Sequence, residues 1–297
     1  MIIAGDMVRS SKQSSLGDPC AENVAENHIH IHIHIHDFNV VKGRRAAAVK
    51  TVTVMSQKGG VGKTSTAWAL VNGLGVTGRS VLAVDLDGQG DLTYSMGGSS
   101  GALLDVLQGK GTARAAVQHT DQGDLLAGSD SLALLDMYVQ RNDTLRRALE
   151  PLQGKYDYCV IDTPPALGRA TLTALTASDA VVVPVLADVL SVKQLQAALR
   201  TVEAVQGASS RLRYVGILVT MFDRRPTLNR ECLELLESVA ASKGAHMFEA
   251  KVRNGVAIRE AAARRENPFI THGRAGAVLD YAAFIAELIA ALEGLRA

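Results

Sequence analysis

Short apolar runs rich in β-branched residues alternate with helix-patterned stretches along most of this chain, and this alternation limits the folds open to it. The apolar runs occupy 49–56, 80–87, 156–162, 180–186 and 213–222, and helical spacing is found in stretches that include 64–75, 191–206 and 228–242. Nearly continuous apolar runs are typical of strands buried on both faces of a parallel sheet. The alternation predicts an α/β fold, a mostly parallel twisted sheet with helices on both faces, whose ligands bind at the carboxyl ends of the strands.

The pattern begins near residue 46, and we expect residues 46–297 to form one domain because no internal repeat or long linker interrupts them. Residues 1–45 are polar and patternless up to HIHIHIHIH at 28–36, which holds five of the eight histidines. As a strand, this tract would place its histidines on one face, where they could bind a metal ion as polyhistidine does. No carboxylate or cysteine at ligand spacing completes a defined site, so we interpret residues 1–45 as a disordered or tag-like extension.

Charge and cysteine content bear on partners and compartment. Lys+Arg 31 against Asp+Glu 30 gives a net charge of +1, so a surface that binds a polyanion must be local. Cys20, Cys159 and Cys232 form neither a metal-ligand spacing nor an even-numbered disulfide framework, which favours a reducing compartment. The first residues lack the apolar core of a signal peptide, and no run of about 18 apolar residues occurs. We therefore expect a cytoplasmic protein.

A glycine-rich segment, GGVGKTS at 59–65, follows the first predicted strand and opens the first predicted helix. In that context glycines let backbone N–H groups turn toward phosphates, and the amino end of the helix adds a positive dipole. Lys63 is expected to neutralise the β and γ phosphates, and the Thr64 hydroxyl to ligate Mg²⁺. The residues of this segment predicted to bind ATP are Gly59, Gly60, Val61, Gly62, Lys63, Thr64 and Ser65.

Three aspartates stand at the ends of predicted strands. Asp85 and Asp87, two residues apart, point the same way from a strand and repel each other unless a cation or a proton is present. Asp162 ends the apolar run YDYCVID, and the next residues, Pro164 and Pro165 among them, take the chain out of the sheet. An acid in this position beside a phosphate loop holds Mg²⁺ directly or through water. We predict Asp85 and Asp162 as Mg²⁺ ligands; for Asp85 and Asp87 the alternative is that these carboxylates only cap a helix.

The phosphate loop resembles that of the deviant Walker A ATPases, P-loop NTPases whose loop reads K-G-G-x-G-K-[ST]. Gln57 stands where the ordinary P-loop has glycine, and Lys58 occupies the position of the signature lysine. The resemblance implies that Lys58 is a catalytic and ATP-binding residue, which crosses a dimer interface to the phosphates bound by the partner subunit. From the residue alone, an ordinary solvated lysine on a loop is equally open. The stretch VLAVDLDGQGDLT resembles the family's D-x-D-P-Q-G-N segment, with Gly88 for proline and Asp91 for asparagine. It implies a catalytic role for Asp87, which would position the attacking water.

Within that family, residues 49–295 resemble the ParA/Soj chromosome and plasmid partition ATPases, which share the ParA/MinD-like fold. The matching segments include TLTALTASDAVVVPVLADVLSVKQL, GILVTMFDRRPTLNRECLELL and KVRNGVAIREA. The resemblance implies an ATP contact at the acidic position Asp188. Where the family reads I-P-R-N, it implies contacts of Val252 and Asn254 with the nucleotide base.

The same resemblance implies a function. ParA/Soj proteins bind ATP and Mg²⁺, form an ATP-dependent homodimer, bind double-stranded DNA without sequence preference, and are released when a ParB-type centromere-binding protein stimulates hydrolysis. About 48 residues precede the first predicted strand, too few for the amino-terminal helix-turn-helix domain of larger plasmid ParA proteins. The chain therefore resembles the short, Soj-like type, which implies a cytoplasmic, nucleoid-associated ATPase that does not bind membranes.

A basic region supplies candidate DNA contacts. Residues 211–274 hold Lys+Arg 12 and Asp+Glu 7, a balance of +5 in a chain that is otherwise near neutral. Contacts made by charge alone suit DNA binding that ignores sequence. The alternative is a solvated helix face on which Glu260 and Glu266 pair with the arginines. The candidates are Arg224, Arg225, Arg253, Arg259, Arg264, Arg265 and Arg274.

Two other functions are open to a chain with this loop. A membrane-positioning ATPase of the MinD type ends in a basic amphipathic helix. The last residues here, DYAAFIAELIAALEGLRA, carry three acids and one base. A metabolic ligase of the dethiobiotin synthetase type needs a pocket for a small carboxylate, and we find no motif for one. An iron–sulfur reductase would need cluster cysteines after the carboxylate strands, which the sequence lacks.

Overall fold

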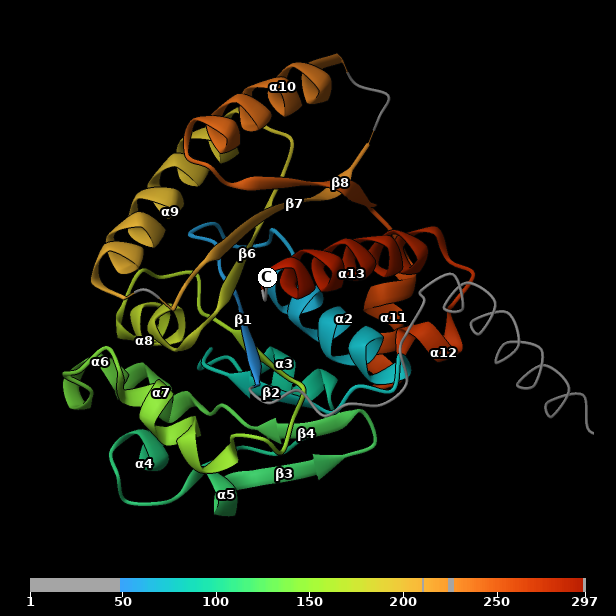
Figure 1. Cartoon of the computed structure of the whole chain (residues 1–297). Coiled ribbons are helices and arrows are strands. Elements are labelled where there is room, and N and C mark those ends of the chain that lie inside the picture. The colour runs from blue at the N-terminus through green and yellow to red at the C-terminus, as the bar shows by residue number, and fades with distance from the viewer. Residues whose placement is uncertain (1–48, 210, 224–226, 296–297) are drawn as a thin grey trace, which may run out of the picture.

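The computed structural model describes residues 49–209, 211–223 and 227–295, except for the side chains of 227–229 (Figure 1). The His/Ile tract and the arginines Arg224 and Arg225 lie outside this part. The strands are β1 (Lys50–Val54), β2 (Val81–Asp85), β3 (Val117–Thr120), β4 (Gly123–Leu126), β5 (Tyr158–Asp162), β6 (Ala180–Val185), β7 (Tyr214–Phe222) and β8 (His246–Arg253). The α-helices are α2 (Lys63–Val76), α3 (Asp91–Ser95), α4 (Leu103–Leu107), α5 (Ala113–Ala116), α6 (Leu135–Tyr138), α7 (Thr144–Leu149), α8 (Arg169–Ala177), α9 (Val189–Ala208), α10 (Thr227–Ser242), α11 (Val256–Arg264), α12 (Pro268–Thr271) and α13 (Gly276–Gly294).

The strands form one eight-stranded sheet in the order β3-β4-β2-β5-β1-β6-β7-β8. Only the β3–β4 pair is antiparallel within the described sheet. β2, β5 and β6 are buried at every position, as expected for strands covered on both faces. The predicted mostly parallel α/β fold is confirmed.

Helices cover both faces of the sheet (Figure 1). On one face α2, α11, α12 and α13 share a core with β1 and β5, centred on side chains such as Trp68 and Phe284. On the other face α4, α7 and α8 pack over β2 and β5, and α9 and α10 pack over β6 and β7. This sandwich leaves the carboxyl ends of β1, β2 and β5 side by side, with Val54 and Asp85 each opposite Asp162 in the ladders.

The last helix holds the edge of the sheet with two carboxylates. Glu287 of α13 accepts hydrogen bonds from the backbone N–H groups of Glu249 and Ala250, both at 2.8 Å. Asp280, two turns earlier, accepts one from the N–H of Arg253 at 2.9 Å. β8 is the last strand of the sheet, and its register against β7 is irregular, which leaves these N–H groups for side chains. α13 therefore packs along this edge of the sheet, and two of its acids support the strand beside it.

Candidate functional site

The phosphate loop joins β1 to α2 as predicted. Gly60 and Gly62 have φ angles of 72° and 81°, in the left-handed region that favours glycine, and Gly62 caps α2. The Thr220 hydroxyl near the end of β7 donates to the carbonyl oxygen of Val61 at 2.8 Å, with the carbonyl oxygen of Val185 as a second acceptor 3.2 Å away, and so fastens the loop to the neighbouring strands. The first backbone N–H groups of α2 then face the space above the loop, where a phosphate would bind.

Lys63, the first residue of α2, is buried beside the predicted carboxylates. Burial lowers the pKa of its ammonium group, and the charges of Asp162 and Asp87 oppose that effect. Its Nζ lies 3.3 Å from the carbonyl oxygen of Lys58, within the curve of the loop. A buried lysine among carboxylates at a helix amino end is suited to neutralise phosphate charge.

Asp162 is a buried carboxylate with one oxygen available to a cation. It is fully buried at the end of β5, and its Oδ1 accepts a hydrogen bond from the N–H of Thr163 at 3.1 Å. Burial raises its pKa well above the ordinary value, the charge of Asp85 adds to the rise, and a hydrogen bond from Thr64 opposes it. Its Oδ2 is buried without a partner. A carboxylate oxygen without a donor, next to a threonine hydroxyl, fits Mg²⁺.

The described residues contain no group of three or more His, Cys, Asp or Glu that could hold a metal ion by itself. Mg²⁺ is commonly bound by one or two carboxylates together with water and substrate phosphates. The arrangement around Thr64 and Asp162 therefore fits a metal that arrives with a nucleotide.

Asp85 differs from Asp162 because its oxygens already have donors. Oδ2 accepts from the backbone N–H and the hydroxyl of Thr93, at 2.8 and 2.7 Å, and Oδ1 accepts from the N–H of Asp87 at 3.1 Å. Burial raises its pKa to about 6, and these hydrogen bonds limit the rise. Asp85 thus caps α3, which was the alternative open from the sequence, and its assignment as a Mg²⁺ ligand stays a prediction.

Asp87 lies in the segment between β2 and α3 and is half-buried. Its Oδ1 accepts from the backbone N–H of Gln89 at 3.1 Å. Its charge influences the pKa values of both Lys63 and Asp162, so it stands close to the place of the phosphates. The second oxygen of this carboxylate is the one suited to orient a water molecule.

Lys58 contacts Asp188 of its own chain. Its Nζ lies 2.6 Å from Asp188 Oδ2 and 3.4 Å from the Ser191 hydroxyl, and Asp188 caps the amino end of α9. Burial acts to raise the pKa of Asp188, but the hydrogen bonds from Lys58 and Ser191 outweigh it and lower the pKa. Lys58 therefore connects Asp188 to the phosphate loop, and the predicted contact of Asp188 with ATP stays a prediction.

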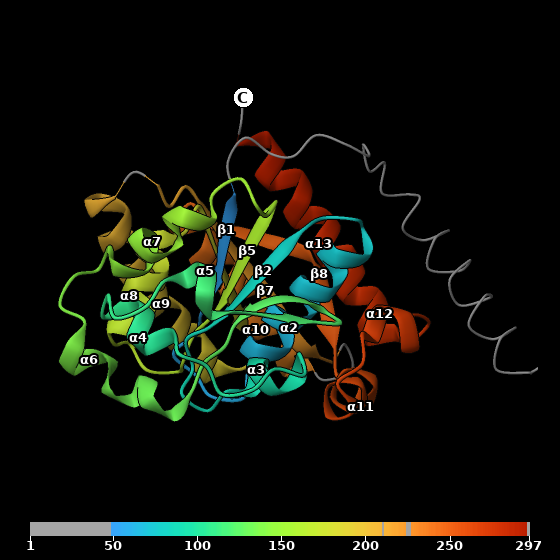
Figure 2. The same ribbon diagram turned by 90° about the horizontal axis from the view of Figure 1, so that it is seen from below.

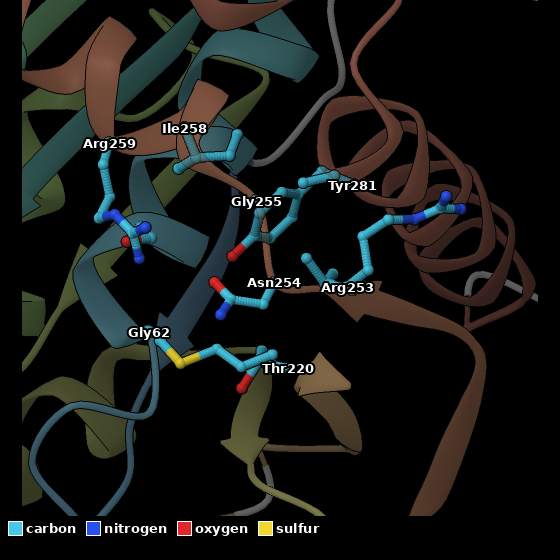
Figure 3. Close-up of a pocket in the computed structure, with 12 residues that line it drawn as sticks. Gly62, Thr220, Arg253, Asn254, Gly255, Ile258, Arg259 and Tyr281 are labelled. Atoms are coloured by element: carbon cyan, nitrogen blue, oxygen red, sulfur yellow. The ribbon is translucent and has the colours of Figure 1, made fainter. Parts of the chain in front are cut away.

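A pocket lies between the start of α2 and the segment after β8 (Figure 3). Gly62 and Ser65 line one side, and the predicted base contacts Val252 and Asn254 line the other. The structure thus brings together the residues predicted for phosphates and for the base. The pocket also uses residues that the sequence analysis did not single out, namely Thr220, Met221, Ile258, Ala277 and Tyr281.

The candidate DNA-binding arginines in the described part differ in availability. Figure 3 shows the side chain of Arg253 turned away from the pocket, and it makes a bidentate contact with Asp280 at 2.7 and 2.8 Å. The Arg265 guanidinium lies over the ring of Tyr94, 4.4 Å from its centroid. Arg259 and Arg264 on α11, and Arg274, are exposed. Within the described part, three of the five candidates, Arg259, Arg264 and Arg274, are therefore without such a contact, and Arg259 also lines the pocket.

Comparison with known proteins finds a matching family model and several similar proteins. The family model described as "AAA domain" matches residues 49–213, which contain the phosphate loop and the strands that end in Asp85 and Asp162. The chromosome partitioning protein ParA of Caulobacter vibrioides is 34% identical over 229 residues, 73% of this chain and 85% of that protein. The sporulation initiation inhibitor protein Soj of Bacillus subtilis is 33% identical over 223 residues, 71% of this chain and 87% of that protein.

A solved structure is similar at nearly the same level of identity. It is named cobyrinic acid a,c-diamide synthase from Mycobacterium smegmatis, with bound ADP and magnesium. It is 31% identical, and the similarity covers 81% of this chain and 94% of that one, with a TM-score of 0.69. The likeness therefore includes the chain trace as well as the sequence.

Proposed function

The chain belongs to the ParA/Soj family of partition ATPases, and on that premise we propose that it acts as an ATP-driven switch in DNA segregation. In this proposal ATP closes a homodimer, the dimer binds double-stranded DNA without sequence preference, and hydrolysis stimulated by a ParB-type centromere-binding protein releases it. The protein would then act in the cytoplasm, associated with the nucleoid. The observation that carries the proposal is that Lys58, Lys63, Asp87 and Asp162 lie together at the carboxyl ends of the central strands.

ATP and Mg²⁺ are the ligands that this edge would hold. The backbone of residues 59–65 and the Lys63 ammonium would bind the phosphates, and the pocket at Val252 and Asn254 would hold the base. The Thr64 hydroxyl and the unpartnered oxygen of Asp162 would bind Mg²⁺, whose charge offsets that of the phosphates. The solved relative with bound ADP and magnesium supports this assignment.

Asp87 is the residue proposed to orient the attacking water. Its carboxylate is anchored through one oxygen to the N–H of Gln89, so the other is held in a limited range of directions. Phosphoryl transfer depends mostly on positioning and on neutralising charge, and these are the roles of Asp87 and Lys63. Asp85 would act behind Asp87, since its own oxygens are bound within the chain.

Dimerisation is proposed to move Lys58. In the single chain its ammonium group is paired with Asp188, so reaching the phosphates of a partner subunit requires that this pair open. The side chains of Leu167, Val189 and Leu190 are 48%, 56% and 64% exposed in segments that follow β5 and β6 at the same edge. Exposed apolar side chains beside a charged site support a contact surface for a second copy.

DNA binding is proposed for the exposed arginines of the carboxyl-terminal part. Arg259, Arg264 and Arg274 are free of the contacts that hold Arg253 to Asp280 and Arg265 to Tyr94. A few arginines bind duplex DNA weakly, because each phosphate contact contributes a limited share of the affinity. A dimer joins two such surfaces, which supports DNA binding that depends on ATP.

The membrane-positioning alternative is less well supported. A helix that binds a membrane surface needs its apolar side free to enter the lipid. The apolar side of α13 is buried in the core through Val278, Phe284 and Leu288. No helix in the described part of the chain is long and apolar enough to span a bilayer. The metabolic alternative shares the fold, and its test is whether turnover needs a small carboxylate substrate.

ATP turnover measured alone, with random duplex DNA, and with DNA plus the cognate partner tests the proposal. We expect slow basal turnover that rises when DNA and partner are present together. Asp87→Ala should bind ATP with nearly unchanged affinity, lose turnover, and accumulate as an ATP-bound dimer. The proposal is wrong if the ATP-bound protein does not bind random duplex DNA at low salt, or if it binds equally well without nucleotide.

A further inference from the structure

The Asp85 carboxylate is hydrogen-bonded to both ends of the segment 87–93, which carries Asp87. Its Oδ1 accepts from the N–H of Asp87 at the start of the segment, and its Oδ2 accepts from the N–H and hydroxyl of Thr93 at the end. Gly88 and Gly90 lie between these points, and Gly90 has a φ of 70°. Because glycine restricts the backbone little, the shape of the segment depends on its two anchored ends and on the hydrogen bonds that Asp87 accepts from the N–H groups of Gln89 and Gly90, both at 3.1 Å.

The Thr93 hydroxyl is itself held in one orientation. It donates to Asp85 and accepts from the backbone N–H of Gly128 at 3.0 Å, just beyond the end of β4. A hydroxyl has one proton to donate, so this pair of contacts fixes its direction. Thr93, Asp85 and Gly128 are all buried, and water does not compete for these bonds.

Gly128 packs directly against the same segment. A Cβ at this position would lie 2.8 Å from the carbonyl oxygen of Asp85, 3.0 Å from that of Asp87 and 3.1 Å from the Asp85 carboxyl carbon. No side chain fits there unless the backbone around Asp87 moves. Thr93 and Gly128 therefore both contact the segment, Thr93 by hydrogen bonds and Gly128 by close packing.

We propose that Thr93 is a positioning residue for ATP hydrolysis, which holds Asp85 and, through it, fixes the place of Asp87. Gly128 serves the same end by accepting no side chain and by orienting the Thr93 hydroxyl. This inference rests on the proposed role of Asp87 in orienting the attacking water. In this proposal the Thr93 hydroxyl affects the rate of the chemical step. Thr93 does not line the pocket proposed to hold the nucleotide base.

The direct test is Thr93→Val, which keeps the shape of the side chain and removes the hydroxyl. Single-turnover hydrolysis with excess protein should slow by roughly 10- to 100-fold, the scale of a small misplacement of a catalytic group. ATP affinity should change by less than about twofold, since the phosphate loop and base pocket are untouched. Thr93→Ser keeps the hydroxyl and should restore most of the rate. Thr93→Ala repeats the test should Thr93→Val not fold.

A double variant separates this inference from the role of Asp87. If Thr93 acts through Asp87, adding Thr93→Val to Asp87→Ala should slow hydrolysis no further. Full additivity of the two losses would overturn the inference, as would a Thr93→Val protein with the parent rate or with lowered ATP affinity alone. Normal turnover in Asp87→Ala would instead remove the proposed role of Asp87.

Gly128→Ala tests the packing side of the inference. It should slow hydrolysis with ATP affinity retained, because the added methyl group displaces the segment around Asp87. Gly207→Ala is the matched control, since a Cβ at Gly207 of α9 meets nothing within 4 Å. Equal rates in the two variants would contradict the assignment of Gly128.

Discussion

Replacing Asp162 by asparagine should stabilise the nucleotide-free protein and at the same time abolish ATP hydrolysis. Asp162 is fully buried and one of its oxygens has no partner. Burial raises the pKa of its carboxyl, and the neighbouring charge of Asp85 raises it further. At neutral pH the unfolded chain ionises this group freely, whereas the folded protein does so at a cost, and the difference lowers the free energy of unfolding.

Asp85, the neighbouring buried carboxyl, shows the same direction, because burial raises its pKa from 3.8 to about 6. Taking an ionised carboxyl out of water costs several kcal/mol even after the protein relaxes. The loss is absent below the unfolded pKa, where both states are protonated, grows between the unfolded and folded pKa values, and is complete above the folded value. Since asparagine carries no charge, Asp162→Asn should gain stability at pH 8, on the order of the few kcal/mol that it costs to bury an unpaired ion.

Urea unfolding in the presence of a chelator, at pH 8 and in steps down to pH 5, measures this gain. It should shrink as the pH falls toward the unfolded pKa, and the melting temperature at pH 8 should rise by roughly 5 to 10 °C. Asp121→Asn, at an exposed aspartate, is the control and should change little. A less stable Asp162→Asn at pH 8, or a gain that is the same at both pH values, refutes the reasoning.

Three further predictions follow from the contacts described. Lys63→Ala should weaken ATP binding within one subunit, whereas Lys58→Ala should bind ATP but fail to dimerise; light scattering with and without ATP distinguishes them, and normal dimerisation of Lys58→Ala excludes its action across the interface. Arg264→Glu should weaken binding to unrelated duplexes equally and flatten the slope of log affinity against log salt by about 0.9 per lost contact; titrations at several salt concentrations measure this, and an unchanged slope contradicts it. Glu287→Ala should lower the free energy of unfolding by about 1 to 2 kcal/mol, since two backbone N–H groups lose their acceptor; urea unfolding and ATP titration measure stability and binding, and a loss of ATP affinity without a loss of stability contradicts it.

The central strands could be predicted because they are buried on both faces. β2 and β5 are buried throughout, so their sequences run without polar interruption to the final aspartate. The same pattern does not predict β8. This strand lies at the edge of the sheet and its register against β7 is irregular, so charged and apolar residues are mixed along its sequence. The β3–β4 hairpin escapes prediction for another reason, because four residues per strand are too few to show a period.

The phosphate loop and its carboxylates could be predicted because each lies within one short segment next to a strand. The residues that hold them in place could not. Thr93 meets Gly128 over 35 residues of chain, and Thr66 meets Tyr281 over 215, and a single sequence carries no signal for such pairs. The basic region shows the same limit, since the count of charges does not reveal that Arg253 is bound to Asp280.

One glutamine side chain connects three helices near the candidate site. Figure 2 shows α3 and α11 at the same end of the molecule. Gln122, in the turn between β3 and β4, accepts hydrogen bonds from Trp68 and Asn72 of α2 and donates to the carbonyl oxygens of Ser95 and Arg265. One side chain thus joins the helix of the phosphate loop, the helix behind Asp87, and the end of the arginine-bearing α11.

The two carboxylates that α13 places against β8 limit the ways in which another strand can pair with the edge of this sheet. An edge strand with free N–H groups is a template on which any passing strand can extend the sheet, with or without nucleotide. Glu287 and Asp280 occupy three of these groups on β8. In the proposed ATP-dependent dimer, copies must not pair through this edge without nucleotide, and these acids prevent such pairing by occupying its N–H groups.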